Sequence, residues 1–383
     1  MFGGAYENEG MITHILDMDR EAEMHFRNLS FVRSLTFMGA IAVVLSLVPG
    51  QAIAQSVNAK PAKPATENWT APRTVDGQPD LQGVWSNNNA TPLERPKELA
   101  GRALLTEQEV AALKKKAAEL FDNGNSDAAF GDSVFESVLA NVKGTKSGFK
   151  SIDGETGDYS SVWTVARDWD NRTSLITDPP DGRLPPMTPH AAEKQHAAFA
   201  ARNNRPSGPE DRSLQERCIT YGSPQLVAGY QSYYQIVQGS NSVVIMTEMI
   251  HDARIIPLDG HPHLPPNIQN WLGDARGHWE GDTLVVDTTN FKPGVFRNVS
   301  TEKLHVVERF TRTGPDTLQW QLTIDDPGAW TKPWTAMIPL KPSKKAVYEY
   351  ACHEGNYGLE SILAGARRED KAAETAEKTS QPK

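Results

Sequence analysis

The second half of the chain, from Arg217 onward, is built from short segments in which apolar and polar side chains alternate. In the segment TLVVDTTNF (283–291), Leu284, Val286 and Thr288 fall on one face and the residues between them on the other. A period of two is typical of β-strands. The same pattern predicts strands over residues 232–238, 242–249, 253–256, 277–281, 283–291, 304–313, 317–325, 334–340 and 346–352.

Tight connections separate several of these segments, such as Gly-Ser-Asn at 239–241 and Gly-Pro-Asp at 314–316. Short strands joined by hairpin turns indicate an antiparallel meander. We expect a mainly β fold in which the meander closes into a lipocalin-like β-barrel, since closure removes exposed edges. The segment DLQGVWS (80–86) is expected to be the first strand. Its Gly-x-Trp is similar to that of lipocalin-like barrels, but an ordinary core role for Trp85 is the favoured interpretation.

Two helices are predicted at the periphery of this barrel. Residues 106–121 begin with Thr106 and Glu109 at the spacing of a capping box, and apolar residues then recur at helical intervals. A second helix is expected from Thr188, a good N-cap followed by a proline, to about Arg202. Between them, residues 173–186 contain a short strand and a turn, and residues 122–160 are expected to be a long loop.

The N-terminal part of the chain has the features of a secretory signal. Residues 24–54 combine a basic start, an apolar run from Leu35 to Val48 and the small-residue site Ala52-Ile53-Ala54. The apolar run is shorter than the about 20 residues that span a bilayer, so a membrane anchor is the weaker alternative. Residues 1–23 are rich in Asp and Glu and are interpreted as a gene-start extension, with translation beginning at Met24. The expected location is therefore periplasmic or secreted.

The remaining chain is divided by composition. Residues 55–80 are rich in Pro and Ala and predict a flexible leader, residues 81–366 a single mainly β domain with a helical insertion near 106–202, and residues 367–383 a charged disordered tail. The formal net charge is −9, without a sustained basic run, which argues against a nucleic-acid partner. No membrane span is expected in the mature chain. The sequence does not indicate an oligomeric state.

The chain has two cysteines, Cys218 and Cys352. In an exported protein an even number of cysteines favours a disulfide, and two cysteines allow one intramolecular pairing. Two separate buried thiols are the alternative.

The densest cluster of chemically active residues is HDARIIPLDGHPHLPP (251–266). We consider His251, Asp252, Arg254 and His263 candidate catalytic residues, because a histidine with a carboxylate can move protons and arginine can hold a polar substrate group. His261 and His263 form an H-x-H pair. A metal site is not expected, because zinc usually needs three or four ligands and no third histidine lies nearby. The Pro-Leu-Asp-Gly segment is expected to be a turn.

Two further clusters follow. In GDARGHWEGD (273–282), charged residues alternate, so they share one face that meets either solvent or a polar cavity. In YACHEGNYG (350–358), His353 and Glu354 are further acid–base candidates, with a strand-end turn as the plain alternative. Trp279 and Tyr357 are expected to line a ligand. Nucleotide-binding and common hydrolase signatures are not found in the sequence, and no cofactor is expected.

These segments together resemble a large family of exported bacterial proteins of unknown function. The resemblance is carried by DLQGVW, HDARIIPLDG, GDARGHWEGDTLVV, WTKPWTA and YACHEGNYG, covers about residues 80–366 and is strongest in the last 150. It implies export and the extent of the domain rather than a reaction. Members of the family have an arginine at the position of His261, which implies that H-x-H is not a shared metal motif.

Three functions remain open from the sequence. The first is an exported enzyme of the hydrolase, lyase or isomerase class that processes a small molecule at the mouth of the barrel. The second is a non-catalytic lipocalin-like carrier of an apolar or aromatic small molecule, which the aromatic content suits equally. The third is an envelope protein with an interaction role. The polarity of the barrel interior is expected to discriminate between the first two.

Overall fold

The computed structural model describes residues 69–121, 132–145, 167–203, 205–226, 228–229 and 231–380. The predicted extension 1–23, the predicted signal peptide 24–54 and the leader up to residue 68 lie outside the described residues. So does most of the predicted loop 122–160. All described residues belong to one unit, which runs from Ala62 to Lys383.

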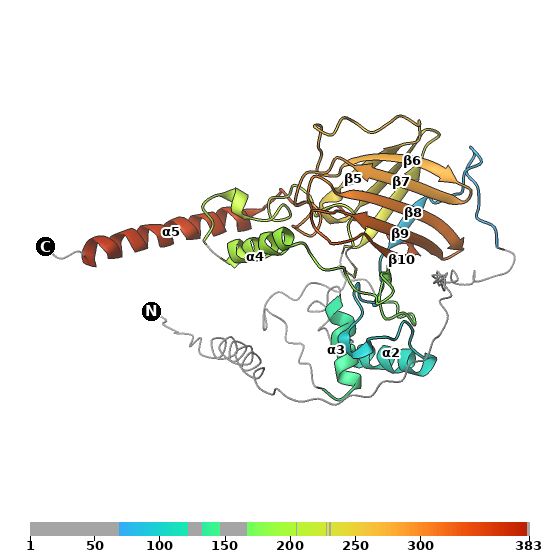
Figure 1. The fold of residues 1–383 in the computed structure, drawn as a ribbon, viewed down its shortest axis with the longest axis horizontal. Helices are drawn as coiled ribbons and strands as arrows, with labels where there is room; N and C mark the ends of the chain where they lie inside the picture. Colours follow the sequence, from blue (N-terminus) through green and yellow to red (C-terminus); the bar gives the residue numbers. More distant parts are fainter. Residues whose placement is uncertain are drawn as a thin grey trace, which may run out of the picture. The chain divides into compact units, whose positions relative to one another are not determined.

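The described residues form a mainly β structure with ten antiparallel strands in one sheet and four α-helices (Figure 1). The strands are β1 (Gly83–Ser86), β2 (Ile176–Asp178), β3 (Tyr233–Gln238), β4 (Ser242–Thr247), β5 (Ala253–Pro257), β6 (Asp274–Glu280), β7 (Thr283–Thr289), β8 (His305–Gly314), β9 (Thr317–Asp325) and β10 (Trp334–Ser343). The α-helices are α2 (Glu107–Phe121), α3 (Asp132–Val142), α4 (Pro189–Asn203) and α5 (Tyr357–Ser380), and short 3-10 helices cover Lys97–Leu99, Pro209–Asp211 and Met249–His251.

The sheet consists of two meanders joined by β1. The strand order is β5-β4-β3-β1-β10-β9-β8-β7-β6, and β2 pairs with β10 outside this path. The first strand therefore lies between β3 and β10, where Trp85 is paired with Tyr234 on one side and Pro342 on the other. The antiparallel meander predicted from the sequence is confirmed on each side of β1.

The two end strands of the sheet, β5 and β6, approach each other without forming a hydrogen-bonded ladder. Gly277 of β6 makes this approach possible, because a Cβ atom there would lie 2.7 Å from side-chain atoms of Ile256 and Leu258. The sheet is thus curved enough to bring its ends together but is not a closed barrel.

One face of the sheet is a continuous apolar core. The alternation in β7 is as predicted, with Leu284, Val286 and Thr288 all buried. Trp85, Trp320, Trp330 and Trp334 are almost fully buried in the same structure, and the rings of Phe310 and Trp320 stack 5.7 Å apart. The helices α2 and α3 share a smaller core with Leu99 and Trp169.

The two helix starts predicted from the sequence are confirmed. Thr106 Oγ1 accepts a hydrogen bond from the Glu109 amide, while the Glu109 carboxylate accepts one from the Thr106 amide at 2.8 Å. Thr188 Oγ1 accepts a bond from the Ala191 amide at 3.1 Å at the start of α4.

Several local predictions are wrong. The loop expected at 122–160 contains helix α3. Residues 346–352 are not a strand, because both edges of β10 are already paired, with β9 and with β1. The tail expected to be disordered from residue 367 is helical through Ser380, and Arg205 forms ion pairs with Glu369 and Asp370 of this helix. The structure describes the predicted leader only from residue 69 onward. This part is held in place by a hydrogen bond from Arg73 to Asp282 at 2.5 Å.

Candidate functional site

The HDAR segment begins at a sharp change of direction between β4 and β5. Ile250 and His251 both have left-handed backbone conformations, with φ of 59° and 47°. Such conformations are uncommon for residues with a side chain, and they cost free energy. The turn sends the side chains of His251, Asp252 and Arg254 to three different places.

His251 lies at the surface and braces a neighbouring segment. Its side chain is exposed, and Nδ1 donates a hydrogen bond to the main-chain oxygen of Tyr350 at 3.0 Å. HDAR and the segment 350–358 therefore meet through a backbone carbonyl and not through a shared set of catalytic side chains.

Arg254 lies inside the sheet and is neutralised there. It forms a two-fold ion pair with Glu308 of β8, with a distance of 3.0 Å between Nη2 and Oε1. Trp320 Nε1 donates to the same Oε1, also at 3.0 Å. Burial lowers the pKa of Arg254, but the attraction of Glu308 outweighs it and keeps the pKa above its ordinary value. Arg254 is thus a charged, paired interior residue and is not open to a substrate.

Asp252 is half-buried and is held by a single oxygen. Its Oδ2 accepts hydrogen bonds from Thr220 Oγ1 at 2.7 Å, from the Tyr221 amide at 3.3 Å and from Gln225 Nε2 at 3.3 Å. Its Oδ1 accepts no hydrogen bond from the described residues. Burial raises the pKa of Asp252 above the ordinary value, and the three hydrogen bonds oppose this shift without cancelling it.

Asp252 lines one small space, and its hydrogen-bond partners line a second, much larger one. On the interior side, Asp252, Arg254 and Trp320 line a cavity of about 20 Å³, which has room for about one water molecule. On the other side, Thr220, Tyr221 and Gln225 line a pocket of about 640 Å³, within the usual range for small-molecule sites.

The large pocket is bounded by residues 213–228 on one side and residues 294–298 on the other. The two walls meet at Gly222, where φ is 105° and a Cβ atom would lie only 2.5 Å from the main-chain oxygen of Val295. Glycine is required at this position by both the conformation and the close approach. We call this space the Asp252 pocket.

The two cysteines are at disulfide distance. The sulfur atoms of Cys218 and Cys352 are 2.07 Å apart, which agrees with the predicted pairing. The bond ties one wall of the Asp252 pocket to the segment 350–358, and Asn356 adds a hydrogen bond to the main-chain oxygen of Glu216 at 3.1 Å.

The structure does not bring the other sequence candidates to Asp252. His353 and Glu354 are exposed, and neither side chain bonds to another described residue. Tyr357 begins helix α5 with 74% of its surface exposed. Trp279 is half-buried and packs against the core of the sheet.

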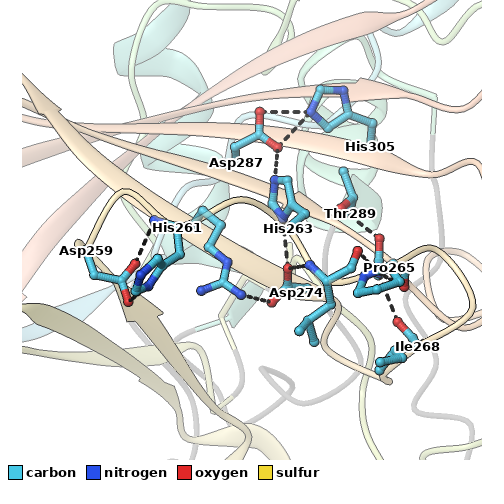
Figure 2. Close-up of polar contacts among 12 residues, drawn as sticks. Asp259, His261, His263, Pro265, Ile268, Asp274, Asp287, Thr289 and His305 are labelled. Carbon is cyan, nitrogen blue, oxygen red and sulfur yellow. Dashed lines mark hydrogen bonds and ion pairs between the residues drawn. The ribbon is translucent and has the colours of Figure 1, made fainter.

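His263 belongs to a separate polar network on the other face of the sheet (Figure 2). Its Nδ1 lies 2.9 Å from Asp274 Oδ2, and its Nε2 lies 3.0 Å from Asp287 Oδ1. His305 Nε2 contacts the same Asp287 carboxylate at 3.0 Å. Arg276 donates to the other oxygen of Asp274 at 3.1 Å, so acidic and basic groups alternate along the chain of contacts.

This network fastens the connection from β5 to β6 onto the sheet. Asn290, in a left-handed conformation, donates to the main-chain oxygens of Leu264, Pro265 and Ile268, each at 3.0 Å. The Pro-Leu-Asp-Gly segment is the expected turn, in which Asp259 accepts a bond from the His261 amide. His261 and His263 therefore have different partners. Among the residues that the structure describes, no cluster of His, Cys, Asp and Glu has a metal-binding arrangement.

No family profile matches the chain, and no curated protein matches it. Within the described residues, no helix combines the length and apolar character of a membrane span. The site must therefore be interpreted from its own geometry.

Sequence reasoning missed the partners of the candidate residues. Glu308 had a detectable signal, because it occupies the same alternating phase as Val306 and Phe310, which face the core. Thr220 and Gln225 had none, since they approach Asp252 from about 30 residues upstream through irregular chain.

Proposed function

We propose that this chain is an exported small-molecule-processing enzyme in which Asp252 is the acid–base group and the Asp252 pocket holds the substrate. The observation that carries the proposal is the position of Asp252 itself. It is a half-buried carboxyl group with a raised pKa, and its hydrogen-bond partners form the wall of a pocket large enough for a metabolite.

The environment of Asp252 suits proton transfer. A general acid or base works best when its pKa lies near the working pH, and burial moves a carboxyl group in that direction. Three donors fix Oδ2, which leaves Oδ1 to take or release a proton. Hydrolase, lyase and isomerase reactions all need such a group.

The proposal changes the roles expected for the neighbouring residues. Arg254 stabilises the interior through Glu308 and does not hold the substrate, and His251 positions the segment that follows β10. His263 belongs to the outer network. Of the four candidates in HDAR and the turn after it, Asp252 alone is assigned to the chemistry.

A carrier of an apolar small molecule is the second candidate. Leu226, Met249 and Phe296 in the pocket lining favour it, because an apolar lining binds a ligand without chemistry. The interior cavity of about 20 Å³ has no room for such a ligand, so the carrier would use the same Asp252 pocket.

Export and family membership belong to the same proposal. The disulfide between Cys218 and Cys352 supports an oxidising compartment, as the apolar run and Ala-x-Ala site of residues 24–54 suggest. Determination of the mature N-terminus after expression in a Gram-negative host tests it. A start at Gln55 supports export, and an uncleaved chain in the cytoplasm contradicts it.

The enzyme proposal is tested by incubating the protein with a metabolite library and following depletion by mass spectrometry. The wild type should consume at least one compound, and Asp252→Asn should lose most of that activity, about 100-fold or more, while keeping its melting temperature. Asp282→Asn, at an exposed turn, is the matched control and should retain activity. Binding of library members without depletion favours the carrier.

A further inference from the structure

The Asp252 pocket has an unbalanced charge. Among the described residues that line it, Arg297 is the one with a formal charge. A second cation lies close by, because Lys194 Nζ is 3.9 Å from the position of a Cβ atom on Gly294 at the pocket wall. The carboxylate of Asp252 lies behind its partners Thr220 and Gln225. The rim of the pocket is therefore positive.

Arg297 differs from three arginines of the sheet in having no bonded partner among the described residues. Arg254, Arg276 and Arg309 all donate to carboxylates. The exposed side chain of Arg297 forms no hydrogen bond or ion pair with the residues described here. Burial raises the pKa of Asp132 of α3, and the charge of Arg297 opposes this shift without cancelling it.

The backbone that presents Arg297 is held in an unfavourable conformation. Arg297 and Asn298 are consecutive left-handed residues, with φ of 52° and 61°. Ser300 maintains this turn, because its main-chain oxygen accepts a bond from the Gly294 amide and its Oγ accepts one from the Phe296 amide. Strain of this kind is often concentrated at binding sites.

The rest of the lining combines apolar and aromatic side chains with the polar side chains of Ser213, Gln215, Thr220, Gln225 and Asn298. Leu226, Met249, Val295 and Phe296 contribute to the same pocket, and Tyr221 adds a ring with a polar end. The apolar part of this surface suits the carbon skeleton of a small organic molecule.

We propose that the Asp252 pocket binds a small organic acid, with its apolar or aromatic body against Met249 and Phe296 and its single carboxylate on Arg297. The planar guanidinium matches a carboxylate with two parallel hydrogen bonds. A second anionic group at the inner end is disfavoured by Asp252. This inference rests on the proposed function in that it names the substrate class for the same pocket.

The test compares acids with neutral amides of the same shape. Calorimetric titration of the purified protein with phenylacetate and phenylacetamide, and with hexanoate and hexanamide, measures the preference for the charged group. Each acid should bind about tenfold or more tightly than its amide. Arg297→Gln should remove this preference, Arg297→Lys should keep part of it, and Arg309→Gln, on the outer face of β8, should leave it unchanged.

Three results overturn the inference: no binding of either acid at millimolar concentration, equal binding of acid and amide, or an acid preference that survives Arg297→Gln. The enzyme proposal fails separately. If acids bind through Arg297 but none is turned over, the organic-acid inference stands and the enzyme proposal fails. If neutral compounds are turned over in a way that depends on Asp252, the enzyme proposal stands and the organic-acid inference fails.

Discussion

His263 and His305 share one oxygen atom, since the Nε2 atom of each lies 3.0 Å from Oδ1 of Asp287. The other ring nitrogen of His263 faces a second carboxylate, that of Asp274. A neutral imidazole has one N–H, so both contacts of His263 are hydrogen bonds only when the ring carries two protons. Within this network, the contact between His305 and Asp287 is expected to depend on pH.

The first prediction concerns this pH dependence. The hydrogen bond between His305 and Asp287 raises the pKa of His305 and lowers the pKa of Asp287. The raised pKa of His305 gives stability that is complete below about pH 6.5 and is lost as the pH rises through the folded value. The lowered pKa of Asp287 gives stability that is complete above about pH 3.9 and is lost as the pH falls.

Melting temperature between pH 3 and 9 checks this, with wild type compared against His305→Gln. The two proteins should differ most near pH 5 to 6 and converge in alkaline solution. Both side chains are more than a third exposed, so the difference should be about 1 kcal/mol or less. The same difference at pH 9 as at pH 5.5 would contradict the assignment.

The second prediction concerns the buried pair of Arg254 and Glu308. Glu308→Gln leaves a buried guanidinium without its counter-charge while keeping an oxygen that can accept from Trp320, so it should destabilise the fold by about 3–5 kcal/mol. Urea unfolding measures the change. The exposed pair of Arg309 and Glu280 is the control, and Glu280→Gln should cost at most about 1 kcal/mol. Equal effects of the two substitutions would show that the interior pair is not desolvated.

The third prediction concerns the disulfide. Cys218 and Cys352 are 134 residues apart in sequence, and closing a loop of that length restricts the unfolded chain by up to roughly 5 kcal/mol. Cys218→Ala with Cys352→Ala should therefore lower the unfolding free energy by several kcal/mol, and dithiothreitol should do the same to the wild type. A wild type that is insensitive to the reductant would rule out a stabilising bond.

The fold was predictable wherever one segment carried its own signal. Alternation located β3 to β10, and the capping residues Thr106 and Thr188 located two helices. The strand expected at 346–352 failed because pairing depends on a free neighbouring edge, and β10 has none. The helix at the C-terminal tail was not predicted, because its many charged residues are typical of a solvated, disordered segment. In the structure, Asp370 pairs with Arg367 within the helix and with Arg205 from outside it.

The site was predictable in part for the same reason. HDAR was found from its composition, but composition does not say which way each side chain points. Two consecutive left-handed residues, Ile250 and His251, precede the point at which Asp252 turns toward Thr220 and Gln225 while Arg254 enters the core. Arg297 carried no sequence signal, since its proposed role rests on its place in the pocket lining and on its lack of a bonded partner among the described residues.

The central claim is that Asp252 is a titrating group at the wall of a ligand pocket. A carbon-13 NMR titration of its carboxyl, assigned with Asp252→Asn, tests this most directly. The account predicts a midpoint above the ordinary aspartate value of about 3.9, and a further upward shift when phenylacetate places a negative charge in the pocket. A midpoint at or below that value, unchanged by phenylacetate, would contradict it.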